Sequence, residues 1–173
     1  MIDLHSDTVY ALWSRGGEET LLSNSLSISR DTLIRGGVRG QCFALFTPMH
    51  EHIPEGKRHL SPWEILNELH DRFSTEMERA AIPILTDPSQ LKDGALHAIL
   101  TTEEGAAIEG DISRLPILHS WGVRIFGLTW NYENELGYPN SKAPKVMGMG
   151  LKEKGFEAIG ECSRLGMLID VSH

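Results

Sequence analysis

Short apolar runs alternate along this chain with longer stretches in which apolar residues recur at helical spacing. The apolar runs cover residues 2–5, 38–46, 96–101, 124–129 and 167–171. Gly, Pro or Asp lies close to the ends of these runs. Runs of this length, with such boundaries, predict buried strands of a parallel sheet.

A capping box opens the clearest predicted helix, which we expect over about residues 62–81. Ser61 and Glu64 have the capping-box spacing, and Pro62 occupies the first helical position. Apolar residues then recur at helical spacing, at Leu66, Leu69, Phe73 and Met77.

Two further helices are predicted at residues 151–165 and near 111–121, and the second of them must accommodate Pro116. Strands that alternate with helices of this length predict an α/β fold, a parallel sheet with crossover helices. Two long loops, 47–60 and 130–150, each follow a strand. They are therefore expected at the carboxyl end of the sheet, where α/β proteins build their active sites.

Composition narrows the class of protein. The chain has 173 residues, a net charge of −8 and no basic cluster, which argues against a nucleic-acid partner. We expect a single domain over residues 1–173. Cys42 and Cys162 lie in apolar patterns and are interpreted as core residues. No signal peptide pattern and no apolar run near 18 residues is present, so we expect no membrane segment and a cytoplasmic location.

Polar residues with useful chemistry stand at four of the predicted strand ends. His5 and Asp7 are two residues apart, and a strand would direct both to one side. Imidazole and carboxylate together suit a divalent metal such as zinc. Further along, Glu103-Glu104 ends one strand, Asn131 and Asn134 follow another, and the last run ends at His173. Four such ends on one side of a parallel sheet favour a functional site.

These segments together resemble the membrane (renal) dipeptidase family of the amidohydrolase superfamily. The resemblance rests on five segments: Asp3 to Thr8, Glu104-Gly105, Gly122 to Arg124, Leu128 to Asn134, and Gly166 to His173. It implies a parallel (β/α)8 barrel that holds two zinc ions. It also implies a zinc-dependent dipeptidase, in which a metal-bridging hydroxide attacks the peptide bond of a dipeptide.

The resemblance assigns a role to each candidate residue. His5 and Asp7 match ligands of the first zinc ion, and Glu104 matches the catalytic carboxylate that bridges both ions. Glu103 competes with Glu104, but the glutamate directly before glycine fits the family pattern better. His173 matches a catalytic histidine that contacts the substrate and is not a metal ligand. Asn131 and Asn134 are expected to shape the substrate pocket.

The chain departs from the family pattern in length. About five β/α units are predicted, whereas a closed barrel has eight, and the further histidines of the second zinc ion are missing. We therefore expect an N-terminal portion of a longer hydrolase, which binds one zinc ion weakly and is not active alone. Two alternatives stay open: an amidohydrolase of another amide or ester, and an inactive metal-binding or interaction protein. A homo-oligomer is also left open.

His50-Glu51-His52 has ligand-like spacing but lies in a polar loop. We interpret this segment as a solvated loop rather than as a metal site.

Overall fold

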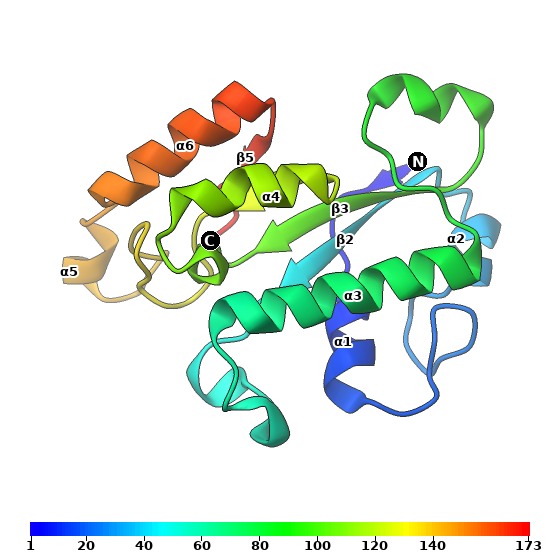
Figure 1. Cartoon of the computed structure of the whole chain (residues 1–173), viewed down its shortest axis with the longest axis horizontal. Coiled ribbons are helices and arrows are strands. Elements are labelled where there is room, and N and C mark those ends of the chain that lie inside the picture. Colours follow the sequence, from blue (N-terminus) through cyan, green and yellow to red (C-terminus); the bar gives the residue numbers. More distant parts are fainter.

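Five parallel strands form one sheet in the order β1-β2-β3-β4-β5 (Figure 1). The computed structural model describes the backbone of residues 1–173 and all side chains except those of Lys92 and Asp93. The strands are β1 (Ile2–Asp3), β2 (Gly40–Phe46), β3 (His97–Glu103), β4 (Val123–Gly127) and β5 (Leu168–Asp170). Each predicted apolar run thus overlaps a strand, although β3 and β4 extend beyond the predicted ranges, and the predicted parallel arrangement is confirmed.

Six α-helices accompany the strands. They are α1 (Thr8–Arg15), α2 (Arg30–Arg35), α3 (Pro62–Ala80), α4 (Leu115–Ser120), α5 (Pro144–Met147) and α6 (Glu153–Leu165). The predictions for α3 and α6 are confirmed to within two residues. Short 3₁₀ segments occupy the loops, among them η1 (His50–His52).

The helix predicted near 111–121 is divided in the structure. A 3₁₀ turn, η5 (Ile112–Arg114), precedes α4, and Pro116 lies in the first turn of α4. Proline is tolerated there because the first helical N–H groups have no partner within the helix. The prediction was wrong about continuity because it extended one helix across a position that favours a helix start.

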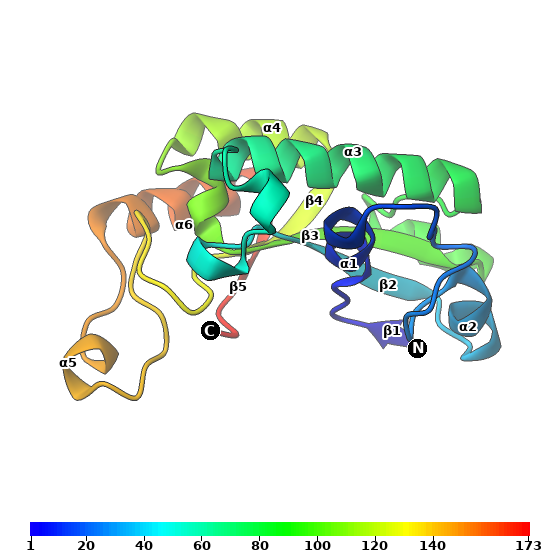
Figure 2. The ribbon, with the colours of Figure 1, turned by 90° about the horizontal axis from the view of Figure 1, so that it is seen from below.

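The hydrophobic core lies between the sheet and the helices on one of its faces. Helices α1 and α3 pack on β2, α4 packs on β4, and α6 packs on β5. Figure 2 shows α3 and α4 next to each other on the same side of the sheet. In this layer Phe73 of α3 meets Phe43 of β2, with ring centroids 6.1 Å apart, and both side chains are fully buried.

The opposite face of the sheet is partly open. Leu4 is 71% exposed and Leu168 is 66% exposed. Together with Thr101 and Ile125 they line a cavity of about 400 Å³ that also reaches Glu103. The strands at the two ends of the order, β1 and β5, each pair with one neighbour only. No described helix is both long enough and apolar enough to cross a membrane.

Candidate metal centre at the carboxyl end of the sheet

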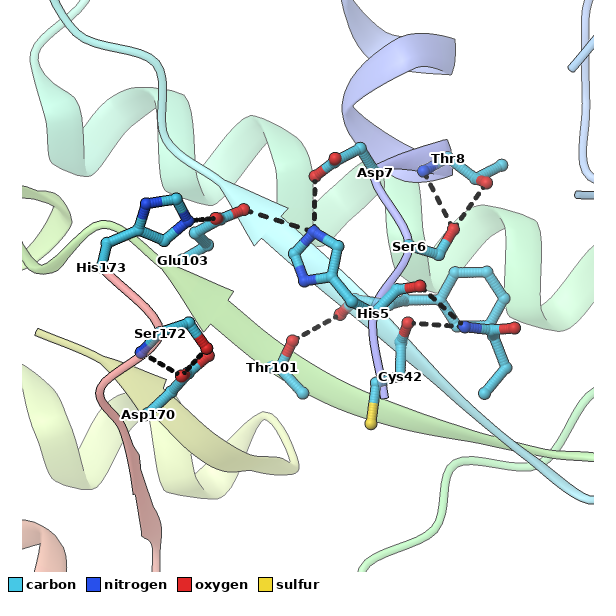
Figure 3. Close-up of polar contacts among 12 residues, drawn as sticks. His5, Ser6, Asp7, Thr8, Cys42, Thr101, Glu103, Asp170, Ser172 and His173 are labelled. Atoms are coloured by element: carbon cyan, nitrogen blue, oxygen red, sulfur yellow. Dashed lines mark hydrogen bonds and ion pairs between the residues drawn. The ribbon is translucent and has the colours of Figure 1, made fainter. Parts of the chain in front are cut away.

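His5, Asp7 and Glu103 converge at the carboxyl ends of β1 and β3 (Figure 3). The Nε2 atom of His5 lies 3.3 Å from Asp7 Oδ1 and 3.5 Å from Glu103 Oε2. One ligand atom from each residue lies within 4.8 Å of the other two. We call these three residues the metal-ligand cluster. One imidazole nitrogen and two carboxylate oxygens form a donor set that suits a divalent metal ion such as zinc.

The carboxylate of Asp7 is available because a neighbouring side chain does the capping. Asp7 is the N-cap residue of α1, but its side chain makes no capping hydrogen bond. Instead, the backbone N–H of Thr8 donates to Ser6 Oγ at 3.2 Å, and the two hydroxyl groups lie 2.7 Å apart. Asp7 is therefore free to turn towards His5.

His173 approaches the cluster from β5. Its Nε2 atom lies 3.2 Å from Glu103 Oε1, the carboxylate oxygen that does not face His5. A tight turn brings His173 to this place, since the N–H of Ser172 donates to Asp170 Oδ1 at 2.9 Å and the Ser172 hydroxyl donates to the same atom. The carboxylate of Glu103 thus lies between two imidazoles, as Figure 3 shows.

Without a bound cation, the surroundings of the cluster favour the protonated forms of Glu103 and His5. Burial is the main cause that raises the pKa of the Glu103 carboxyl, and the negative charge of Asp7 raises it further. The charges of His5 and His173 lower the same pKa. The hydrogen bond to Asp7 is the main cause that raises the pKa of His5, with burial opposing it. Metal ligands must be deprotonated, so a cation that binds here would have to displace protons.

Glu104 lies outside the cluster, which corrects its predicted role as the bridging ligand. Its side chain is fully buried and its backbone has a φ of 83°. Oε1 accepts hydrogen bonds from Ala106 N at 2.9 Å and from Asn134 Nδ2 at 2.6 Å. Oε2 accepts from Trp130 N at 3.3 Å. Because these donors occupy both oxygens, the carboxylate that faces His5 and Asp7 is Glu103.

The two asparagines predicted to shape the pocket differ in placement. Asn131 is exposed in the loop after β4. Asn134 is buried, donates to Glu104 and to Leu128 O at 2.9 Å, and accepts from Leu136 N at 2.8 Å. The expectation that Asn134 lines the substrate pocket is therefore corrected: its side chain holds the loop together from within.

An aromatic group stands next to the cluster, and the sequence did not reveal it. Trp130 packs edge-on against Phe46, with centroids 4.8 Å apart, and against His52 at 5.1 Å. Tyr132 lies 6.1 Å from Trp130 and 4.6 Å from His50. We call these five residues the aromatic group. The segment His50-Glu51-His52 belongs to this packing, and among the described side chains it is not part of the metal-ligand cluster.

Comparison with known proteins gives the family of the chain. Residues 1–173 match the membrane dipeptidase family, peptidase family M19. Over 81 residues the chain is 36% identical to Dipeptidase aclJ of Aspergillus oryzae, which corresponds to 46% of this chain and 19% of that protein.

Solved structures show the same fold. A dipeptidase of metallopeptidase family M19 superposes with a TM-score of 0.80 at 23% identity, covering 99% of this chain and 57% of that one. A metallopeptidase from Rhodobacter sphaeroides, bound to a phosphinate mimic of the dipeptide L-Ala-D-Ala, superposes with a TM-score of 0.82 at 21% identity. There the coverage is 99% of this chain and 59% of that one.

The chain therefore spans somewhat more than half the length of these two solved proteins, and its five strands form a half-barrel. This chain belongs to the membrane dipeptidase family, peptidase family M19.

Proposed function

We propose that this chain supplies the first part of the active site of a zinc-dependent dipeptidase, whose complete form hydrolyses the peptide bond of dipeptides. Membership of a metallopeptidase family supports the reaction class. The phosphinate dipeptide mimic bound by the Rhodobacter sphaeroides relative supports the substrate class.

The position of Glu103 carries the proposal. One of its oxygens faces His5 and the other faces His173, at 3.5 Å and 3.2 Å. Glu103 therefore contacts both the histidine of the metal-ligand cluster and His173. His5, Asp7 and Glu103 would hold one zinc ion. His173, beside Glu103, is proposed to contact the substrate next to that ion.

The donor set of the chain fits zinc, although it completes only one of the two sites. Bound zinc would supply Lewis-acid polarisation of a peptide carbonyl and of water near neutral pH. Asp7 and Glu103 contribute negative charge, and the partial burial of Glu103 strengthens its attraction for a cation. We propose that the remaining ligands come from segments that the longer relatives possess in addition.

Adjacent glutamates allow a sharp experiment on metal binding. Zinc affinity is measured by calorimetry for the wild type, Glu103→Gln and Glu104→Gln. Glu103→Gln should weaken zinc binding by more than about tenfold, since even outer partners of metal ligands are worth roughly 10–100-fold. Glu104→Gln should retain zinc binding while lowering stability by about 1–3 kcal/mol, because a buried hydrogen-bonding carboxylate is altered. Equal zinc affinity for wild type and Glu103→Gln would contradict the assignment.

The reaction itself is tested on the zinc-loaded full-length protein with a panel of substrates. Dipeptides should be hydrolysed faster than N-acyl amino acids, cyclic amides and esters. Faster hydrolysis of one of these other substrates would favour an amidohydrolase of different specificity.

A further inference from the structure

We propose that Trp130 is a specificity-determining residue of this site, which packs against an apolar side chain next to the scissile bond of the dipeptide. This inference rests on the proposed function and adds to it the class of side chain that the site prefers. It assigns a substrate contact to a member of the aromatic group, and no residue of this group belongs to the metal-ligand cluster.

Trp130 lies next to the residues that face the metal site. Its ring centroid lies 6.2 Å from that of His173, which in turn lies 3.2 Å from Glu103. The register of the sheet pairs Phe46 with Glu103, so the packing partner of Trp130 also ends a strand beside the cluster. A dipeptide whose peptide bond meets the cluster would therefore bring a neighbouring side chain close to the indole.

The backbone of Trp130 is held firmly in place. Its N–H donates to the buried carboxylate of Glu104, and the same carboxylate binds the side chain of Asn134. Asn134 also accepts from the N–H groups of Leu136 and Gly137, so the loop after β4 closes on itself. A rigid aromatic ring loses little conformational entropy on binding, which makes it an effective contact for a ligand.

The η1 turn supports the ring from a second side. The Tyr10 hydroxyl donates to His52 O at 3.2 Å, and the Tyr132 hydroxyl donates to Glu51 Oε1 at 2.7 Å. These bonds connect η1 both to α1 and to the loop that carries Trp130. His52 packs edge-on against the indole, so the turn is part of the support rather than a separate surface element.

The charges around the indole favour a neutral partner. Asp7 and Glu103 are the proposed zinc ligands, so the bound cation would neutralise them, whereas Asp170 lines the same cavity and Glu51 lies in the η1 turn. The charges of Asp170 and Glu51 would repel an acidic side chain, whereas an aliphatic or aromatic side chain meets a flat apolar ring. We therefore expect Leu- or Phe-containing dipeptides to be preferred over Asp- or Glu-containing ones.

The experiment compares substrates and variants in the zinc-loaded full-length protein. The ratio of kcat/KM for Phe-containing dipeptides to that for Ala-Ala is measured in wild type, Trp130→Phe and Trp130→Ala. Trp130→Ala should lower this ratio by roughly tenfold or more, the effect of losing apolar contacts in a specificity pocket. Trp130→Phe should lie between the two. As a matched control, Trp121→Phe changes a tryptophan that packs between α3 and α4 and should leave the ratio unchanged.

A binding measurement distinguishes failure of the specificity role of Trp130 from failure of the proposed dipeptidase function. Phosphinate dipeptide mimics with an alanine or a phenylalanine side chain are titrated by calorimetry, without any need for turnover. Tighter binding of the phenylalanine mimic in wild type, lost in Trp130→Ala, supports the inference. An unchanged preference in Trp130→Ala overturns it, even if dipeptides are hydrolysed. A protein that neither hydrolyses dipeptides nor binds either mimic overturns the proposed function and the inference together.

Discussion

Two glutamates that follow each other in the sequence end up in different surroundings. Glu103 is the last residue of β3 and reaches the partly open face of the sheet, where His5 and His173 lie. Glu104 has a positive φ of 83°, and its side chain enters the buried interior towards Asn134. The reversal at this point separates the carboxylate of the candidate metal centre from one that supports the next loop, and it allows each to be changed independently.

Gly105, which follows this reversal, packs closely against the end of the next strand and offers a prediction at the scale of one residue. A Cβ atom at Gly105 would lie 2.4 Å from Leu128 O and 2.6 Å from Leu136 Cδ1. Gly105→Ala should therefore destabilise the protein by about 1–3 kcal/mol, the usual effect of overpacking. Urea unfolding measures the change.

The control for this substitution is Gly160→Ala in α6. No atom lies within 4 Å of a Cβ built at Gly160, so the alanine should stabilise the protein by roughly 0.5–1 kcal/mol through its helix propensity. If both variants shifted stability in the same direction, close packing around Gly105 would not be the determining factor.

At the scale of elements, α3 and α4 are joined by a stack of rings. His70 of α3 lies 4.1 Å from Trp121 at the end of α4, with the rings 14° from parallel, and Trp63 of α3 also stacks on Trp121 at 5.6 Å. Burial lowers the pKa of His70, and the nearby Asp71 opposes this only in part. The stack therefore favours neutral His70, and protonation weakens the contact between the two helices.

This stack predicts a dependence of stability on pH. The pKa of His70 is lower in the folded than in the unfolded protein, so the unfolded chain binds its proton first as the pH falls. The contribution of neutral His70 is complete above the unfolded pKa of about 6.5 and is lost as the pH falls below it. Between pH 7.5 and 5.5 the wild type should lose more stability than His70→Phe, as measured by urea midpoints.

His59→Phe serves as the control, because His59 is exposed in the loop before α3. This variant should show the same loss of stability as the wild type over the same pH range. A His70→Phe variant that also follows the wild type would contradict the proposed contribution of the stack.

For the whole molecule, the partly open face of the half-barrel is the surface through which we expect chains to associate in solution. Leu4, Ile125 and Leu168 line its cavity, and the strands at both ends of the sheet order have one neighbour each. Exposed apolar surface next to unpaired strand edges favours association between chains. The 173-residue chain by itself is therefore expected to self-associate.

Size-exclusion chromatography at several concentrations tests this expectation. Leu168→Glu should shift the elution towards the monomer because it places a charge on the open face. Phe156→Glu is a matched control, since Phe156 in α6 is 65% exposed and Leu168 is 66% exposed. Equal elution of the two variants would show that the open face is not the surface of association.

The succession of the strands and of the longer helices was accessible from local pattern alone. The capping box at Ser61 and the apolar spacing behind it defined α3, because helix capping and amphipathic burial act within a few residues. Helices α1, α2 and α5 were not predicted; each is short, and α1 depends on packing against β2 and α3. Short helices are stabilised mainly by such tertiary contacts, which no local pattern contains.

By itself, the sequence determined the β/α alternation, the pairing of His5 with Asp7, and the motifs that resemble the family. Only the tertiary structure decided between Glu103 and Glu104, placed Asn134 inside the loop, and joined η1 to Trp130. Strand alternation could have favoured Glu103, since it shares a face with Thr101 on β3. The placement of Asn134 and the contact between η1 and Trp130 depend on segments that lie apart in the chain. The direction in which a carboxylate points is set by the local backbone and by the hydrogen-bond partners that the fold brings to it.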